Sequence, residues 1–265
     1  MSSNSSNHKL EAAAAPVAPK YSLKRRILMC IALPVWAFLG FMLSQALILV
    51  LIQVLQKIGV PLSQINGSLF QTIVGGIIYA LTLFIVIGVP WLVKKARTTK
   101  QEVGMQRLPG LMDFVWVPAG AIVYLVLTAI VTSLAMSFLT FVNYDQVQDT
   151  GFANMSSQVE YVLAFIMLVV IAPLAEELLF RGYLFGKLRK YAPLWVAVLI
   201  TSVLFGTVHF AWNVGLDVFA LSIVLCLLRV VSGSLWPSIM LHMLKNGVAF
   251  YFLFINPLVL STLGG

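Results

Sequence analysis

Apolar residues along the chain gather in seven long runs separated by short polar or basic segments. The runs cover roughly residues 27–55, 67–93, 112–141, 159–185, 193–210, 216–232 and 235–255. About 20 apolar residues suffice for a helix to cross a bilayer, and none of the runs shows the two-residue alternation of a barrel strand. The pattern predicts an all-α, polytopic helical membrane protein with about seven transmembrane helices, or eight if Pro34 splits the first run.

Composition supports an integral membrane protein embedded in a lipid bilayer. Of the 265 residues, 60% are hydrophobic and 10% are charged, more apolar surface than a water-soluble fold could bury. The net charge of +8 could suggest a nucleic-acid partner, but the basic residues cluster beside the apolar runs, as topology signals do. We therefore expect no nucleic acid as a partner. Cys30 and Cys226 lie inside apolar runs without a C-x-x-C neighbour, so neither a disulfide framework nor a thiolate metal site is implied.

Lysine and arginine residues predict the orientation of the helices. They gather at 24–26, 94–107 and 187–190, whereas the connections 144–158 and 211–215 contain none. Basic segments stay preferentially in the cytoplasm, so the amino terminus is expected to be cytoplasmic. Residues 1–23, rich in Ser, Ala and Pro, are expected to form a disordered polar tail, followed by N-terminal transmembrane helices over residues 24–156.

Two adjacent carboxylates, Glu176 and Glu177, fall well inside an apolar run. The other seven acidic residues, Asp113 and Asp217 among them, are expected in tails, in loops or near helix ends. A charge near the bilayer centre costs roughly 2.5–3.5 kcal/mol on insertion scales, so such residues usually face the bundle interior and mark a functional site. The pair predicts such a site on the fourth helix.

Helical phase separates the two glutamates. Glu177 and Arg181 are four residues apart and share one helix face, so they are expected to pair, whereas Glu176 points elsewhere without a cation on its own face. Pro173 is expected to bend the helix and open space beside Glu176. A desolvated carboxyl of this kind can exchange protons with water near neutral pH.

The histidines His209 and His242 also lie in apolar runs. Asn246 follows His242 by four residues in H-M-L-K-N, so an imidazole and an amide share a face that can bind a metal or stabilise an oxyanion. Gly206, beside Phe205 in F-G-T-V-H, would allow another helix to approach closely. Counting about 1.5 Å per residue from the helix ends places His209 roughly 8–14 Å deeper than the other candidates, so a shared site requires helix tilt or shifted helix starts.

Three ordered segments, E-E-L-L-F-R at 176–181, F-G-T-V-H at 205–209 and H-M-L-K-N at 242–246, resemble the motifs EExxxR, FxxxH and HxxxN of the CAAX-protease and bacteriocin-processing family, also called CPBP or Abi. These proteins are intramembrane endopeptidases related to the type II CAAX prenyl endopeptidases. The resemblance covers about residues 157–255, and it implies that residues 157–265 form a transmembrane catalytic region.

The resemblance also implies residue roles. Glu176 would activate water together with His209, and His242 with Asn246 would hold and polarise the scissile carbonyl or its oxyanion. The supporting ion pair would be formed by Glu177 and Arg181.

Members of the resembling family have been described both as zinc metalloproteases and as metal-independent glutamate proteases. Glu176, His209 and His242 form a familiar Zn²⁺ ligand set that leaves a position open for water, but the H-E-x-x-H signature is absent. Metal-assisted hydrolysis by a CPBP-type protease is the preferred expectation, and hydrolysis without a cofactor remains open.

The expected partner is a membrane-associated peptide or protein substrate, cleaved near the cytoplasmic face. Nothing in the sequence recognises a prenyl group, and the compact chain resembles bacterial or archaeal members, which favours a bacterial or archaeal cell membrane. Two alternatives stay open: a non-catalytic bacteriocin-immunity or scaffold protein, and a proton-coupled transporter, which also uses buried Glu and His. The oligomeric state is not indicated.

Overall fold

The computed structural model describes residues 21–144, 150–152 and 155–257, and all regular structure within them is helical. Most of the predicted tail, residues 1–20, lies outside the described residues. The first half contains α1 (Leu23–Lys57), η1 (Leu62–Gln64), α2 (Gly67–Leu83), η2 (Phe84–Gly88), α3 (Val89–Lys94), α4 (Lys100–Val103) and α5 (Leu111–Phe138). The second half contains α6 (Gln158–Phe165), η3 (Ile166–Ile171), α7 (Ala172–Glu177), η4 (Leu178–Phe185), α8 (Gly186–Leu188), α9 (Leu194–Thr207), α10 (Trp212–Val231), α11 (Trp236–Phe250) and η5 (Tyr251–Ile255).

Six helices of the described chain are long and apolar enough to cross a membrane, and α9 is a shorter apolar helix of 14 residues. The seven apolar runs therefore correspond to seven helical segments, and the chain is a polytopic helical membrane protein. Pro34 does not split the first run, because α1 continues through it for 35 residues.

One boundary prediction was wrong at α10. The helix begins at Trp212 rather than near residue 216, so Asp217 lies inside it instead of at its end. Residues 211–215, Asn213 among them, were expected to form a connection, but a polar residue can stay helical in an apolar environment when neighbouring segments supply its partners.

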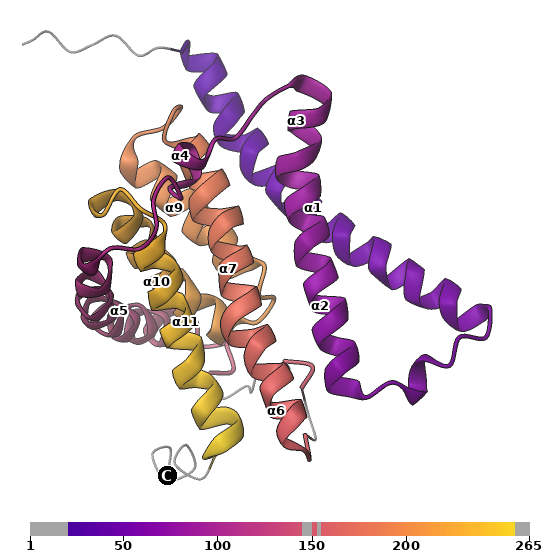
Figure 1. Ribbon diagram of the computed structural model, residues 1–265. Helices are drawn as coiled ribbons and strands as arrows, with labels where there is room; N and C mark the ends of the chain where they lie inside the picture. Colours follow the sequence, from indigo (N-terminus) through magenta and orange to yellow (C-terminus); the bar gives the residue numbers. More distant parts are fainter. Residues whose placement is uncertain (1–20, 145–149, 153–154, 258–265) are drawn as a thin grey trace, which may run out of the picture.

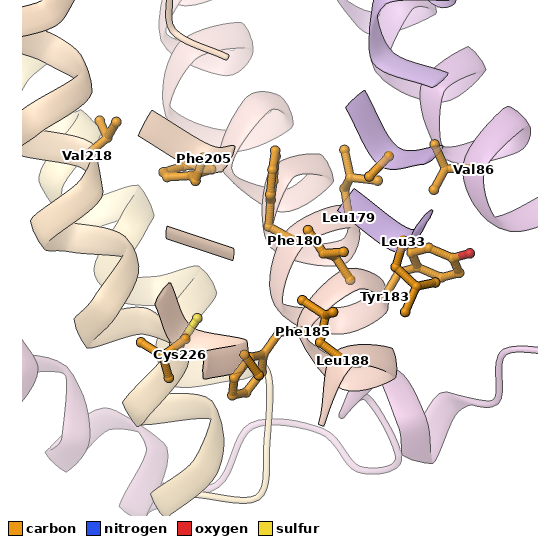
Figure 2. Packing of buried hydrophobic residues seen from close by; sticks show 14 residues of the cluster. Leu33, Val86, Leu179, Phe180, Tyr183, Phe185, Leu188, Phe205, Val218 and Cys226 are labelled. Carbon is orange, nitrogen blue, oxygen red and sulfur yellow. The ribbon is translucent and has the colours of Figure 1, made fainter. Parts of the chain in front are cut away.

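The helix that runs from α6 to α8 is the centre of the bundle. Its segments contact α1 and α2 on one side and α9, α10 and α11 on the other, an arrangement that can be followed in Figure 1. Figure 2 shows the core that surrounds its η4 segment, where Phe180 lies beside Phe205 of α9, and Leu179 lies toward Leu33 of α1. The candidate residues of the EExxxR motif are thus carried by the element with the most neighbours.

Helices α9 and α10 cross at two glycines. A Cβ added to Gly206 would lie 2.8 Å from the carbonyl oxygen of Gly215, and the reverse contact would be 3.0 Å. The backbones can approach this closely only because neither residue has a side chain. The predicted close helix approach at Gly206 is confirmed, and it fixes the end of α9 that precedes His209.

The basic segments meet at one end of the bundle. Arg26 at the start of α1 donates its Nε–H to the carbonyl of Tyr191, 2.8 Å away, and Glu102 of α4 forms ion pairs with Lys187 and Lys190. We call this end, formed by residues 24–26, 94–107, 187–191 and 229–235, the basic end.

Candidate active site

A π-helical turn next to Pro173 leaves a backbone carbonyl in the wall of the site without its usual donor. In the π-helical segment η3 the N–H of Ala172 donates to the carbonyl of Met167, one residue further back than in an α-helix. The carbonyl of Leu168 thereby loses its usual donor, and Pro173, the next residue, has no N–H. Asn246 of α11 supplies the missing donor, because its Nδ2 donates to the Leu168 oxygen at 2.9 Å.

Glu177 lies in the protein interior between a cation and an imidazole. Its Oε1 accepts from Nη1 of Arg181 at 2.8 Å, as helical phase predicts, and from Nδ1 of His242 at 2.9 Å. The side chains of Glu177 and Arg181 are fully buried. Because a carboxylate can only accept, Nδ1 of His242 carries the proton of that hydrogen bond. Glu177 therefore orients His242 as well as pairing with Arg181.

Phe205, the first residue of the FxxxH motif, packs the three ionisable groups together. The Arg181 guanidinium lies 4.2 Å from the centre of the Phe205 ring, a cation–π contact. The same ring meets His209 and His242 edge to face, with centroids 5.1 and 5.7 Å apart. The motif phenylalanine thus links the ion pair to both histidines.

Glu176 faces away from Arg181, as predicted, and finds partners on two other helices. Its Oε1 accepts a hydrogen bond from the hydroxyl of Tyr79 on α2, and its Oε2 lies 3.7 Å from Nε2 of His242. The side chain is 14% exposed, whereas that of Glu177 is fully buried. Glu176 is the carboxylate of the pair that a small molecule such as water can reach.

His209 stands just beyond α9, in the turn that leads to α10. Its Nδ1 lies 2.7 Å from the carbonyl of Phe205 and donates to it, so in the neutral imidazole the lone pair is on Nε2. The next residue, Phe210, has a positive φ of 52° that reverses the chain direction. Because the Phe205 ring contacts both His209 and His242, the depth difference counted from the sequence does not separate His209 from the other candidates.

A cavity of about 320 Å³ joins the candidate residues. Glu176, His209, His242 and Asn246 all line it, whereas Glu177 and Arg181 lie behind its wall. Its remaining lining comes from α1, α2, the central helix, α10, α11, η5, Thr150 and Val208, and is mostly apolar. Phe41 and Tyr79 show that the helices before residue 157 help to form this space.

Sequence reasoning missed a second ion pair beside the cavity. Nζ of Lys245, which lines the cavity, lies 3.1 Å from Oδ2 of Asp217. Tyr124 and Thr128 of α5 donate hydrogen bonds to Oδ1 of Asp217, at 2.6 and 2.9 Å. The signal was the i, i+3 position of Lys245 relative to His242, but Asp217 was expected near a helix end and not as a partner of Lys245.

The donor chemistry of the cavity fits a zinc ion, although the described residues contain no group of three His, Cys, Asp or Glu side chains placed to hold a metal. His242 and His209 both have Nδ1 engaged, by Glu177 and by a backbone carbonyl. Such outer partners are typical of metal-binding histidines, because they leave Nε2 as the ligand atom. Together with Glu176 these atoms would be the ligands.

Comparisons with known proteins place the chain in a family. A sequence model described as "Type II CAAX prenyl endopeptidase Rce1-like" matches residues 158–248. The UPF0177 protein YxdF of Lactococcus lactis is 32% identical over 134 residues, which are 50% of this chain and 70% of that relative. A protein of Escherichia coli described as an uncharacterized 24.3 kDa protein is 33% identical over 89 residues, 32% of this chain and 41% of that relative. No solved structure matches the chain.

The matched residues 158–248 span all three motifs, from Glu176 to Asn246. They also contain the central helix, α9 and α10, whose packing brings the motifs together. The Lactococcus relative is matched over more than two thirds of its length. The chain therefore belongs to the Rce1-like family of CAAX-type membrane proteases, the CPBP family that its motifs resemble.

Proposed function

We propose that the protein is an intramembrane endopeptidase that hydrolyses a peptide bond of a membrane-associated peptide or protein. The observation that carries the proposal is the arrangement of Glu176, which faces the cavity and lies 3.7 Å from Nε2 of His242, while Glu177 is buried with its own charge partner. One carboxylate is thus available for chemistry and the other supports it.

In the proposed reaction, water in the cavity loses a proton to the Glu176 carboxylate as its oxygen attacks the scissile carbonyl carbon. His209, with its Nε2 lone pair, helps to orient that water. The carbonyl π electrons move to oxygen, and the oxyanion is stabilised by His242 and Asn246. As the C–N bond breaks, Glu176 returns its proton to the leaving amine, which balances the hydrolysis.

Metal dependence is linked to the protonation of His242. With a proton on Nδ1 only, Nε2 has a lone pair, and a zinc ion held by Glu176, His209 and His242 would polarise water or the scissile carbonyl. With protons on both nitrogens, Nε2–H donates directly to the oxyanion. We favour the metal-assisted form, because both histidines have Nδ1 engaged by an outer acceptor.

The proposed cleavage position is the membrane half that adjoins the basic end, because His242 lies about two turns from the start of α11 at Trp236. The cavity lining continues along α11 into η5, to Leu253 and Phe254. A substrate segment would occupy this largely apolar space, which suits a hydrophobic peptide. From the distribution of basic residues we propose that the basic end faces the cell interior.

The test is cleavage of a membrane-tethered peptide by the purified protein in detergent. Glu176→Gln and His209→Ala are each expected to lower the rate at least ~10²-fold, as loss of an acid–base group does. Glu102→Gln, the same change at the basic end, is the control and should retain the rate. Unchanged cleavage in both site variants would refute the assigned roles. A cellular function that survives Glu176→Gln would instead favour an immunity or scaffold protein.

Metal content is measured on the same active preparation. We expect zinc to copurify, and we expect its amount to fall in His242→Ala, together with loss of cleavage after chelation and its return on adding Zn²⁺. Full activity of a demonstrably metal-free preparation would establish the metal-independent form.

A further inference from the structure

A second pocket, of about 270 Å³, lies at the basic end. Its walls come from α4, the end of the central helix, and the turn that joins α10 to α11. Two arginines, Arg189 and Arg229, line it together with Glu102 and Gly233. The pocket is separate from the candidate active site and is not used in the proposed hydrolysis.

The two arginines have no acidic partner among the described residues. Arg229 reaches only backbone carbonyls of α4, with its Nη2 3.3 Å from that of Glu102 and 3.5 Å from that of Gln101. Its Nε is buried without any hydrogen-bond acceptor. Arg189 is exposed, and its guanidinium lies 5.8 Å from the ring of Phe185. Two like charges that share one pocket repel each other unless an anion lies between them.

Glu102 does not supply that anion. Its carboxylate is already paired with Lys190 and Lys187. Although partial burial opposes ionisation, the hydrogen bond from Lys190, the Thr99 amide and the charge of Lys187 hold the pKa of Glu102 below its usual value. Four cations thus surround one compensated carboxylate, which leaves the region with an excess of positive charge.

Backbone contacts hold the walls of the pocket in place, so the fold determines the shape of the pocket. The N–H of Leu235 donates to the carbonyl of Gly104 at 2.8 Å. A Cβ on Gly104, which has a φ of +89°, would overlap the Arg229 guanidinium, and a Cβ on Gly186 would lie 3.0 Å from the Glu102 carbonyl. Glycine at both positions lets α4 close over the arginine.

From this geometry we propose that Arg189 and Arg229 form a binding site for a phosphate group, supplied by the headgroup of an anionic membrane lipid. Guanidinium groups bind phosphate oxygens through paired N–H donors. The site lies at the ends of the apolar helices 158–188 and 212–231, the level at which lipid phosphates are found. Basic pockets between transmembrane helices bind anionic headgroups in this way.

The site is tested by lipid-dependent stabilisation of the full chain. Protein purified in detergent is titrated with phosphatidylglycerol, phosphatidylcholine or inorganic phosphate while its unfolding temperature is followed by tryptophan fluorescence. Phosphatidylglycerol is expected to raise the unfolding temperature more than phosphatidylcholine. In Arg189→Gln the half-saturating concentration should rise roughly tenfold, the effect of one lost charged hydrogen bond.

Arg97→Gln is the matched control, because Arg97 is an exposed arginine of the basic end that does not line the pocket. It should behave like the wild type. Arg229→Lys keeps the charge but loses the paired donors, so it should weaken binding while preserving the fold. Stabilisation by inorganic phosphate alone, lost in Arg189→Gln, would show that the phosphate is soluble. An equal response of Arg189→Gln and Arg97→Gln would refute the site.

Discussion

Glu177 has two partners on a single carboxylate oxygen. Oε1 accepts from both Arg181 and His242, while Oε2 is buried and has no hydrogen-bond partner in the described structure. Two of the Arg181 nitrogens, Nε and Nη2, are also buried without an acceptor. Such a buried pair contributes little net stability to the fold, because the desolvation of the two charges offsets most of their attraction. Its value lies in the orientation that it gives to His242.

Removing one member of this pair should be strongly destabilising. In Arg181→Met the Glu177 charge stays buried without its cation, and we expect the free energy of unfolding in detergent to fall by about 3–5 kcal/mol. The control is Lys190→Met, which breaks a partly exposed ion pair with Glu102 and should cost less than about 1 kcal/mol. Similar losses in the two variants would contradict the role of the buried pair.

Tyr79 is expected to position the catalytic carboxylate. Because its hydroxyl donates to Oε1 of Glu176, Tyr79→Phe should leave the base in place but less well oriented. We expect kcat for peptide cleavage to fall about tenfold, with a smaller change in KM, as for loss of one hydrogen bond.

The control for this change is Tyr161→Phe, which removes a hydroxyl that contacts the Met155 carbonyl away from the cavity. Its kcat should match that of the wild type. A Tyr79→Phe enzyme with unchanged kcat, or one that loses activity only through KM, would show that the hydroxyl does not act through Glu176.

At the scale of the elements, the crossing of α9 and α10 determines where His209 lies. Gly206→Ala would place a Cβ 2.8 Å from the Gly215 carbonyl oxygen, a backbone atom that cannot move aside like a flexible side chain. The helices must separate, and His209, three residues further on, moves with them. We expect the variant to lose at least about tenfold in cleavage rate and to be destabilised by about 1–3 kcal/mol.

Gly76→Ala is the matched control for the crossing. Gly76 also lies inside a helix, α2, but a Cβ there meets no atom within 4 Å. The same substitution should be neutral or slightly stabilising, because alanine favours the helix. If both variants unfold at the same temperature and cleave equally well, the close crossing does not matter for the site.

The helices and the Glu177–Arg181 pair could be predicted from the sequence because both depend on local spacing. Apolar run length gives the spans, and the i, i+4 relation gives the pair. Contacts between helices are different: Tyr79 and Glu176 are 97 residues apart. In an apolar membrane helix such as α2, the residues that face lipid and those that face other helices are equally apolar. The sequence therefore does not reveal that Tyr79 lies on the face that packs against the central helix.

The Asp217–Lys245 pair could not be predicted either, because its two residues lie on different helices, α10 and α11. The prediction started the first of these helices near residue 216 and placed Asp217 near its end, whereas α10 begins at Trp212 and holds Asp217 in its second turn, where it pairs with Lys245. Likewise, depth counting assumed helices of equal level and tilt, whereas in the structure His209 and His242 contact the same Phe205 ring. Residue types therefore identified the candidate site, but only packing shows how its members meet.

At the scale of the whole molecule, the charge distribution makes the two ends of the bundle unequal. Arg26, Lys187 and Lys190 meet at the basic end through contacts with Tyr191 and Glu102. The opposite connections 58–66 and 139–144, as far as they are described, contain no lysine or arginine. The positive-inside rule then predicts that the basic end faces the cytoplasm.

This orientation can be tested by labelling single positions in intact cells. Arg97→Cys is exposed at the basic end, and Gln64→Cys is exposed in the connection between α1 and α2 at the other. A membrane-impermeant maleimide should label Gln64→Cys directly, but Arg97→Cys only after permeabilisation. The wild type is the background control, because its Cys30 and Cys226 lie within the spans 23–57 and 212–231.

The result also decides from which side the proposed substrate is cut. His242 lies about two turns from the basic end, so labelling of Gln64→Cys alone places the cleaved bond nearer the cytoplasm and the apolar extension of the cavity toward the outer leaflet. If instead Arg97→Cys is labelled in intact cells and Gln64→Cys only after permeabilisation, the basic end faces outward and cleavage lies nearer the outer face. Because the ion pair and the cavity do not depend on orientation, that outcome would change the side of cleavage without changing the proposed chemistry.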